Sequence, residues 1–243
     1  MSSYLEAITA LGNGNLHPGG FSHTVKVLNS LSIKKNNIVL DIGCGTGRTA
    51  CYLAKKYGAH VFGLDNSEKM IAKAKRRALK ESTDVNFILG DALNMPFGDE
   101  VADIILIESL LIFLPPGKAL QECFRVLKKG GVVVDVELLA HDTLSQTARE
   151  KIKETCGVPQ VPFLEEWTAQ FEHAGFKRIF VTQSKLPGVL DNIKEMLYVD
   201  PHREASPELR TNWELKSLLF RYKILMLANR SHLGFGTFVF TKV

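Results

Sequence analysis

Short apolar runs alternate with amphipathic segments between residues 37 and 139. The apolar runs are nearly continuous, which is typical of strands that helices cover on both faces of a sheet. The pattern predicts parallel strands at "NIVLDIG", "HVFGLD", "VNFIL", "ADIILIE" and "VVVDVELL", and helices over residues 47–57, 67–80 and 116–127. This alternation predicts an α/β domain with a doubly wound sheet.

The rest of the chain departs from the alternation. A helical pattern over "PFLEEWTAQFEHAGF" precedes a sixth strand at "KRIFVTQSKL", and "GFGTFVFTKV" predicts a final strand. Further helices are expected at residues 2–11, 20–31, 142–155, 188–198 and 207–229. We therefore expect four parts: an N-terminal helical lid (1–36), an α/β core (37–184), a helical cap insert (185–232) and the last strand of the core (233–243). The aromatic residues Trp213, Phe220 and Tyr222 are predicted to pack within the cap.

The composition indicates an ordinary soluble domain. The chain has 243 residues, 45% of them hydrophobic, and a net charge of +4, which does not demand a nucleic acid or an anionic surface as partner. Its densest basic cluster comprises Lys73, Lys75, Arg76, Arg77 and Lys80. We interpret this cluster as the solvated face of a helix, and an RNA-binding patch is the alternative.

The cysteines and the N-terminus suggest a cytoplasmic protein. The four cysteines form no CxxC pair, so we expect reduced thiols and no metal site. The N-terminal segment lacks the basic region of a signal peptide. The most apolar stretch contains Asp103 and Glu108 and is too short to span a bilayer.

A glycine-rich loop, "LDIGCGTGRTA", follows the first strand. Such a loop places backbone amides and a helix N-terminus over a ligand. The dinucleotide pattern G-x-G-x-x-G would need Gly or Ala at position 48, where this chain has Arg48. Asp41 precedes the loop and is placed to accept from an ammonium, while the loop amides bind a carboxylate. This combination fits the amino-acid end of S-adenosylmethionine.

Two further carboxylates follow the next strands. Asp65 ends the second strand and is placed to accept both hydroxyls of a ribose. Asp91 and Ala92 follow the third strand and are placed to contact an adenine. Because the carboxyl ends of parallel strands meet at one edge of the sheet, Asp41, Asp65 and Asp91 are expected to face one crevice.

With these motifs, residues 37–139 resemble a class I S-adenosylmethionine-dependent methyltransferase. The segments that carry the resemblance are "VLDIGCGTG", "VFGLD", "GDALNMPF", "ADIILIESLLIFL" and "RVLKKGGVVVDVE". The resemblance implies a seven-stranded, mostly parallel sheet with a reversed last strand, and "LHPGG" and "LGFG" are similar to a subgroup that methylates small molecules. The cofactor-binding residues expected on this basis are Gly20, Asp41, Gly43, Cys44, Gly45, Thr46, Gly47, Asp65, Asn66, Met70, Gly90, Asp91, Ala92 and Glu108.

Methyl transfer from a sulfonium needs alignment of the acceptor and exclusion of water more than chemical activation. A general base is needed only for a poorly ionised acceptor, and the candidates are Glu137, Glu108 and His17. Many similar sequences carry a histidine pair where this chain has Ile112 and Phe113, which predicts an apolar wall there.

We therefore expect methyl transfer to a small-molecule acceptor by in-line displacement. An RNA or protein methyltransferase and a non-catalytic cofactor-binding subunit are the alternatives. A nicotinamide-dependent oxidoreductase is disfavoured by Arg48 and by the reversed strand. A small-molecule substrate is the expected partner, nucleic acid is not, and a homodimer stays open.

Overall fold

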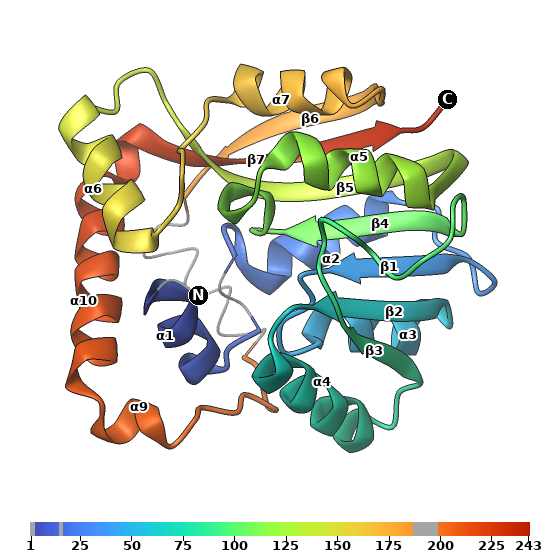
Figure 1. The fold of residues 1–243 in the computed structure, drawn as a ribbon, viewed down its shortest axis with the longest axis horizontal. Coiled ribbons are helices and arrows are strands. Elements are labelled where there is room, and N and C mark those ends of the chain that lie inside the picture. Colours follow the sequence, from blue (N-terminus) through green and yellow to red (C-terminus); the bar gives the residue numbers. More distant parts are fainter. Residues whose placement is uncertain (1–2, 15–16, 187–198) are drawn as a thin grey trace.

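The computed structural model describes residues 3–14, 17–186 and 199–243 and contains one seven-stranded sheet (Figure 1). The strand order is β3-β2-β1-β4-β5-β7-β6. The strands are β1 Ile38–Ile42, β2 His60–Asp65, β3 Val85–Leu89, β4 Ala102–Glu108, β5 Leu127–Ala140, β6 Lys177–Lys185 and β7 Leu233–Thr241. Strands β1 to β5 are parallel, and β7 runs antiparallel to both β5 and β6. The predicted fold class, including the reversed last strand, is confirmed.

The described helices follow the predicted pattern, except that one expected helix is divided. They are α1 Ser3–Leu11, α2 Gly20–Ser30, α3 Arg48–Tyr57, α4 Glu68–Glu81, α5 Pro116–Val126, α6 Gln146–Cys156, α7 Leu164–His173, α9 Glu208–Thr211 and α10 Trp213–Ala228, with short turns η1 Leu111–Phe113 and η3 Arg230–His232. The helix expected over 207–229 is divided at Asn212, because this side chain accepts from the amide of Leu215 and caps α10. The helix expected over 188–198 lies outside the described residues.

Helices cover both faces of the sheet. Alternate residues of each strand point to opposite faces, so the central strands supply two separate cores. Leu106 and Val134 pack with α2, α3 and α4, whereas Ile105 and Val133 pack with α5 and α7. The doubly wound arrangement leaves the carboxyl ends of β1, β2 and β4 at one edge.

A helical layer lies at this carboxyl edge. Helix α1 contacts α6, α9 and α10, and in Figure 1 these helices stand beside the ends of the central strands. Tyr4 of α1 and Tyr222 of α10 are joined by a hydrogen bond, with ring centroids 4.9 Å apart. The N-terminal and C-terminal helical segments therefore form a single cover, although more than 200 residues separate these tyrosines in the sequence.

The basic cluster of α4 is only in part the solvated face that the sequence predicts, because Lys75, Arg76 and Lys80 are exposed but two members are not. Lys73 and Arg77 are buried. Lys73 donates to the carbonyl of Thr9 at 2.6 Å and to the hydroxyl of Ser206 at 3.0 Å, whereas Arg77 pairs with Asp200. Segments distant in the sequence cover these cations, which helical periodicity alone cannot show.

Candidate active site

The glycine loop between β1 and α3 forms the floor of the site. Gly45 and Gly47 have positive φ angles of 52° and 74°, a conformation that favours glycine. A Cβ on Gly47 would lie 2.6 Å from the ring of Phe87, so this glycine allows the loop to pack on the sheet. A Cβ on Gly45 would meet only the Gly43 carbonyl, at 4.0 Å, and would point into open space. The space above Gly45 is therefore available to a ligand.

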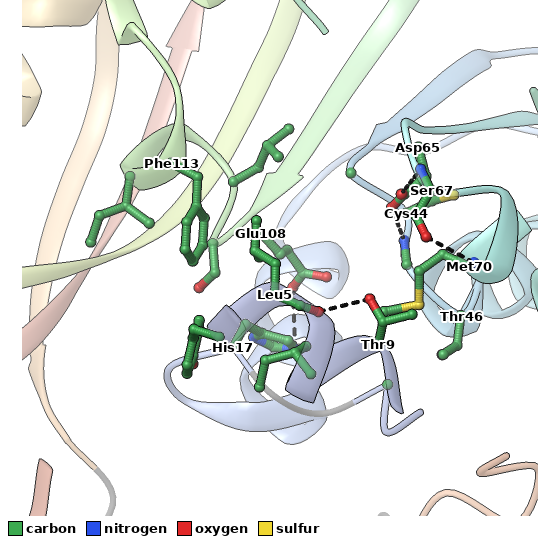
Figure 2. A pocket seen from close by; sticks show the side chains of 18 of the residues that line it. Leu5, Thr9, His17, Cys44, Thr46, Asp65, Ser67, Met70, Glu108 and Phe113 are labelled. Atoms are coloured by element: carbon green, nitrogen blue, oxygen red, sulfur yellow. Dashed lines mark hydrogen bonds and ion pairs between the residues drawn. The ribbon is translucent and has the colours of Figure 1, made fainter. Parts of the chain in front are cut away.

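Asp65 holds the loop from the end of β2. Its Oδ2 accepts from the amide of Gly45 at 2.9 Å, and its Oδ1 accepts from the amide of Ser67 at 2.9 Å. Ser67 in turn caps α4 (Figure 2). Burial raises the pKa of the Asp65 carboxyl, and the two backbone hydrogen bonds oppose part of this rise. Each carboxylate oxygen has a second lone pair, so Asp65 retains acceptor capacity for a ligand hydroxyl.

Asp41 is a buried carboxylate at the end of β1. Its Oδ2 atom has no hydrogen-bond partner among the described residues. Burial raises the pKa of Asp41 well above its ordinary value, and the carboxylates of Glu108 and Asp65 raise it further. A buried oxygen in such a negative setting is stabilised by a cationic donor. This orphaned atom and the open cradle above Gly45 fit the ammonium end of S-adenosylmethionine.

Glu108 lies at the centre of the site, at the end of β4. Its Oε2 accepts from the hydroxyl of Thr49 at 2.9 Å, and its Oε1 accepts from the hydroxyl of Thr24. The Nε2 atom of His17 lies 3.8 Å from Oε1. Figure 2 shows Glu108 between Phe113 on one side and Asp65 with Cys44 on the other. Helices α2 and α3 thus hold this carboxylate between a polar region at the glycine loop and an apolar region at Phe113.

A cavity of about 360 Å³ connects these two environments. One end is polar and contains the glycine loop, Asp41 and Asp65. The other end lies under α1, η1, α6 and α10. Its lining residues are Tyr4, Leu5, Ile8, Ile112, Phe113, Leu114, Leu138, Ile152, Cys156, Val158 and Tyr222. The apolar wall predicted from Ile112 and Phe113 is part of this end.

Ten of the predicted site residues line the cavity, namely His17, Asp41, Gly43, Cys44, Gly45, Thr46, Asp65, Asn66, Met70 and Glu108. Five predicted cofactor contacts do not line it in the part of the chain that the structure describes: Gly20, Gly47, Gly90, Asp91 and Ala92. Asp91 is exposed beyond β3, where its Oδ1 accepts from the amide of Leu93 at 2.9 Å. The adenine contact of Asp91 and Ala92 stays a prediction.

Glu137 lies behind the cavity wall and does not face the cavity. The side chain is fully buried, and its Oε1 accepts from the amide of Leu111 at 2.6 Å. Burial raises its pKa to about 8, although backbone amides of the η1 turn lower it in part. The structure therefore places the predicted substrate-facing group beneath the turn that carries Ile112 and Phe113.

Three of the site residues that the sequence did not indicate are Thr24, Thr49 and Tyr222. Thr24 of α2 and Thr49 in the first turn of α3 donate to Glu108. Tyr222 lines the cavity, whereas it was predicted to be a packing residue only. Trp213 and Phe220, predicted to pack within the cap, are exposed.

Two further observations concern ligands and membranes. Across residues 3–14, 17–186 and 199–243, no group of three or more histidine, cysteine or acidic side chains is arranged to hold a metal ion. No described helix is long and apolar enough to cross a bilayer.

This fold, with a glycine loop and acidic residues at the ends of β1, β2 and β4, defines an adenosyl-cofactor-binding α/β protein. Its similarity to known proteins identifies the family. Residues 39–131 match the family model described as "Methyltransferase domain". The chain is 30% identical over 227 residues to the uncharacterised methyltransferase YodH of Bacillus subtilis (strain 168), covering 91% of this chain and 96% of that protein. The chain belongs to the class I S-adenosylmethionine-dependent methyltransferases.

Other relatives agree with this assignment. Phosphoethanolamine N-methyltransferase 1 of Triticum aestivum is 30% identical over 166 residues, which cover 68% of this chain and 30% of that protein. Among solved structures, the [4+2]-cyclase SpnF has a TM-score of 0.78 at 17% identity, covering 99% of this chain and 92% of that one. Phosphoethanolamine N-methyltransferase 2 of Haemonchus contortus was solved with phosphomonomethylethanolamine and S-adenosylhomocysteine. It has a TM-score of 0.73 at 22% identity, and the match covers 99% of this chain and 56% of that one. These structures share the fold of this chain.

Proposed function

We propose that this enzyme transfers a methyl group from S-adenosylmethionine to an apolar, unphosphorylated small molecule. The observation that carries the proposal is the cavity that runs from the glycine loop past Glu108 into an apolar chamber. A cavity of about 360 Å³ that four helical elements cover suits a small acceptor. An RNA or a protein surface needs a more open face.

The chemistry of the chamber supports an acceptor without phosphate. Some relatives have names that state phosphorylated acceptors, such as phosphoethanolamine and geranyl diphosphate. Recognition of a phosphate requires cationic side chains or clustered backbone amides. Among the described residues, the wall formed by α1, η1, α6 and α10 contributes no lysine or arginine to the cavity. Its polar groups are Tyr4, Thr9, Tyr222 and the thiol of Cys156, which suits an acceptor with a hydroxyl or carbonyl. Arg48 also lines the cavity, but it begins α3 directly after the glycine loop and is not part of this wall.

The polar end would hold the cosubstrate. Asp41 would accept from its ammonium, the amides of the glycine loop would bind its carboxylate, and Asp65 would accept from its ribose. The cosubstrate supplies a methyl group on a sulfonium, which is a good leaving group. The chain contributes orientation of the acceptor in line with that methyl group and exclusion of water by α1. Such positioning can lower a barrier by roughly 7–11 kcal/mol.

Glu108 and His17 are the candidates for proton removal from the acceptor. Both line the cavity between its polar and apolar ends, and Nε2 of His17 lies 3.8 Å from Oε1 of Glu108. A carboxylate beside an imidazole stabilises the imidazolium that forms when the ring takes a proton. A hydroxyl acceptor would need this assistance, whereas a carbon or sulfur acceptor that ionises readily would not.

The first experiment is a calorimetric titration with S-adenosylmethionine, S-adenosylhomocysteine and NAD. Micromolar binding of both adenosyl ligands, without binding of NAD, is the expected result. The second experiment incubates the enzyme with methyl-labelled S-adenosylmethionine and three separate pools: lipid-soluble metabolites, phosphorylated water-soluble metabolites, and RNA with protein. We expect label in the lipid-soluble pool.

Each other outcome has a distinct meaning. Label in the phosphorylated pool would contradict the acceptor class, and label in RNA or protein would contradict the small-molecule assignment. Cosubstrate binding without label in any pool would favour the non-catalytic alternative.

A further inference from the structure

Helix α10 is apolar on two opposite sides. On its inner side, Leu218, Tyr222 and Leu225 belong to the main core or pack against it. On its outer side, four large apolar residues are between 51% and 76% exposed: Trp213, Phe220, Ile224 and Leu227. The inner side explains why the helix docks on α1 and α6. The outer side has no such explanation within the described chain.

The outer residues form one continuous stripe. At 3.6 residues per turn, positions 213, 220, 224 and 227 fall on the same face, directly opposite residues 218 and 222. Helix α10 stands at the left edge of the molecule in Figure 1. Because its inner side packs on α1 and α6, the opposite stripe points away from them. Scattered exposed apolar residues are ordinary, whereas a contiguous stripe marks an interaction surface.

Cations border the stripe on both sides. By the same helical geometry, Lys216 and Lys223 lie along one border and Arg221 lies along the other. All three are exposed, and Glu214 is the one acidic residue within α10. An apolar stripe that includes a tryptophan, with basic residues on its borders, complements the apolar interior and the negative charge of an anionic bilayer surface.

We propose that the outer face of α10 docks this enzyme on an anionic membrane surface. In this arrangement Trp213, Phe220 and Ile224 enter the boundary between headgroups and acyl chains, and the flanking cations contact lipid phosphates. The protein then lies on the bilayer, and none of its described helices is long and apolar enough to span it.

A second copy of the chain fits this face less well. Pairing through α10 would bring the cationic borders of two copies to one interface, where like charges oppose association. One helical stripe also offers less than the roughly 800 Å² per partner of a stable protein interface. An anionic bilayer complements both the apolar stripe and its charge.

Docking at α10 would bring the cavity close to the bilayer. Tyr222 lines the apolar end of the cavity, and Phe220 and Ile224 lie on the outer face of the same helix. An apolar acceptor dissolved in the membrane would therefore enter the enzyme near α10. The docking itself does not rest on the proposed acceptor, because binding to vesicles requires no methyl transfer.

The test measures co-sedimentation of the full-length protein with vesicles of phosphatidylcholine alone or with added phosphatidylglycerol. We expect binding to the anionic vesicles, weakened at least tenfold by 0.5 M salt, and a blue shift of tryptophan fluorescence from the exposed Trp213. The double variant F220S/I224S should lose at least tenfold in binding. The control variant is L79S in α4, because Leu79 is 80% exposed and thus more exposed than Phe220 or Ile224. This variant should bind as the wild type.

Two results would overturn the proposal. One is an absence of vesicle binding by a folded wild-type protein at low salt. The other is a dimer of the wild type that F220S/I224S converts to a monomer, since the stripe would then be an interface between copies. Loss of vesicle binding leaves calorimetric binding of S-adenosylmethionine unaffected, so failure of this proposal is separable from failure of the proposed function.

Discussion

Arg77 and Asp200 form a bidentate ion pair, with Nη1–Oδ1 and Nη2–Oδ2 distances of 2.8 and 2.6 Å. Both side chains are buried, and their pairing lowers the pKa of Asp200 against the effect of its burial. The Nε of Arg77 also donates to the carbonyl of Thr46 in the glycine loop, at 2.9 Å. One guanidinium therefore joins the cosubstrate loop to a segment more than 120 residues away.

This segment, residues 199–206, runs along the end of α1. The amides of Glu204 and Ser206 donate to the carbonyls of Gly12 and Ala10, and Asp200 Oδ2 accepts from the amide of Gly14 at 3.3 Å. Residue Gly14 itself lines the cavity. The ion pair thus holds the cover over the polar end of the site.

Asp200→Ala is expected to loosen this cover. The substitution leaves the buried Arg77 with Glu81 as its remaining carboxylate partner, at 3.2 Å. The loss of the bidentate partner therefore costs at most about 3–5 kcal/mol of stability. We also expect weaker binding of S-adenosylmethionine, by on the order of tenfold. Urea unfolding and calorimetry measure the two effects. Glu204→Ala is the control, because its partly exposed pair with Arg76 is worth less than about 1 kcal/mol. Equal losses in both variants would contradict a special role for Arg77 and Asp200.

Gly45→Ala tests the cradle above the glycine loop. The new methyl group meets no protein atom closer than 4.0 Å, so it would intrude on the ligand. We expect at least tenfold weaker binding of S-adenosylmethionine. Gly130→Ala is a matched control: its φ of 75° imposes similar strain, about 1–2 kcal/mol, and no atom lies within 4 Å of its added Cβ. The two variants should lose similar stability and differ in affinity.

Asp65→Ala should weaken binding of S-adenosylmethionine by tenfold or more, because the ribose loses a charged acceptor worth about 1.5–3 kcal/mol. Calorimetry measures the affinity, and Asp65→Asn separates the charge from the hydrogen bond that orients Gly45. Unchanged affinity in Asp65→Ala would show that the ribose is held elsewhere.

Glu137→Gln should make stability less dependent on pH. Burial raises the pKa of Glu137 to about 8, against about 4.3 in an unfolded chain, and the buried Asp135 on the same strand also has a raised pKa. The folded state therefore binds extra protons above about pH 4.3, and the variant removes the site at Glu137 but keeps Asp135. Protonation of Glu137 stabilises the folded state fully at a pH below the pKa of the unfolded chain. This stabilisation decreases as the pH rises toward 8, by up to about 1.4 kcal/mol per pH unit. Urea unfolding from pH 5 to 9 should give a shallower decline for the variant. Parallel curves would contradict the assignment.

The same variant tests a positioning role. In Glu137→Gln the amide oxygen of the new side chain would still accept from Leu111 and hold the η1 turn, so binding of S-adenosylmethionine should be unchanged. Glu137→Ala removes this acceptor and should raise the KM for the acceptor more than it lowers kcat, because Ile112 and Phe113 line the acceptor chamber. A direct role in chemistry would lower kcat in both variants.

The sequence determined the strands of the sheet and the residues of the glycine loop, and its resemblance to the methyltransferases implied the reversed last strand. Apolar strands of the α/β core have a local periodicity, and Asp41, Asp65 and Glu108 lie at the carboxyl ends of their strands. Because parallel strands end at a common edge, position along the chain was enough to bring these carboxylates to one edge of the sheet. Asp91, which the same argument places in the crevice with Asp41 and Asp65, does not line the cavity.

Tertiary structure alone decided what surrounds them. Lys73 and Arg77 have the helical spacing of solvated cations, and their burial depends on a segment more than 120 residues away. Glu137 has the strand register of a cavity residue, yet the η1 turn lies over it. Tyr222 and Phe220 are neighbours in one apolar helix, and only its docking on α1 and α6 separates the cavity wall from the exposed stripe. Local periodicity specifies which face of an element is apolar, whereas long-range packing decides what covers that face.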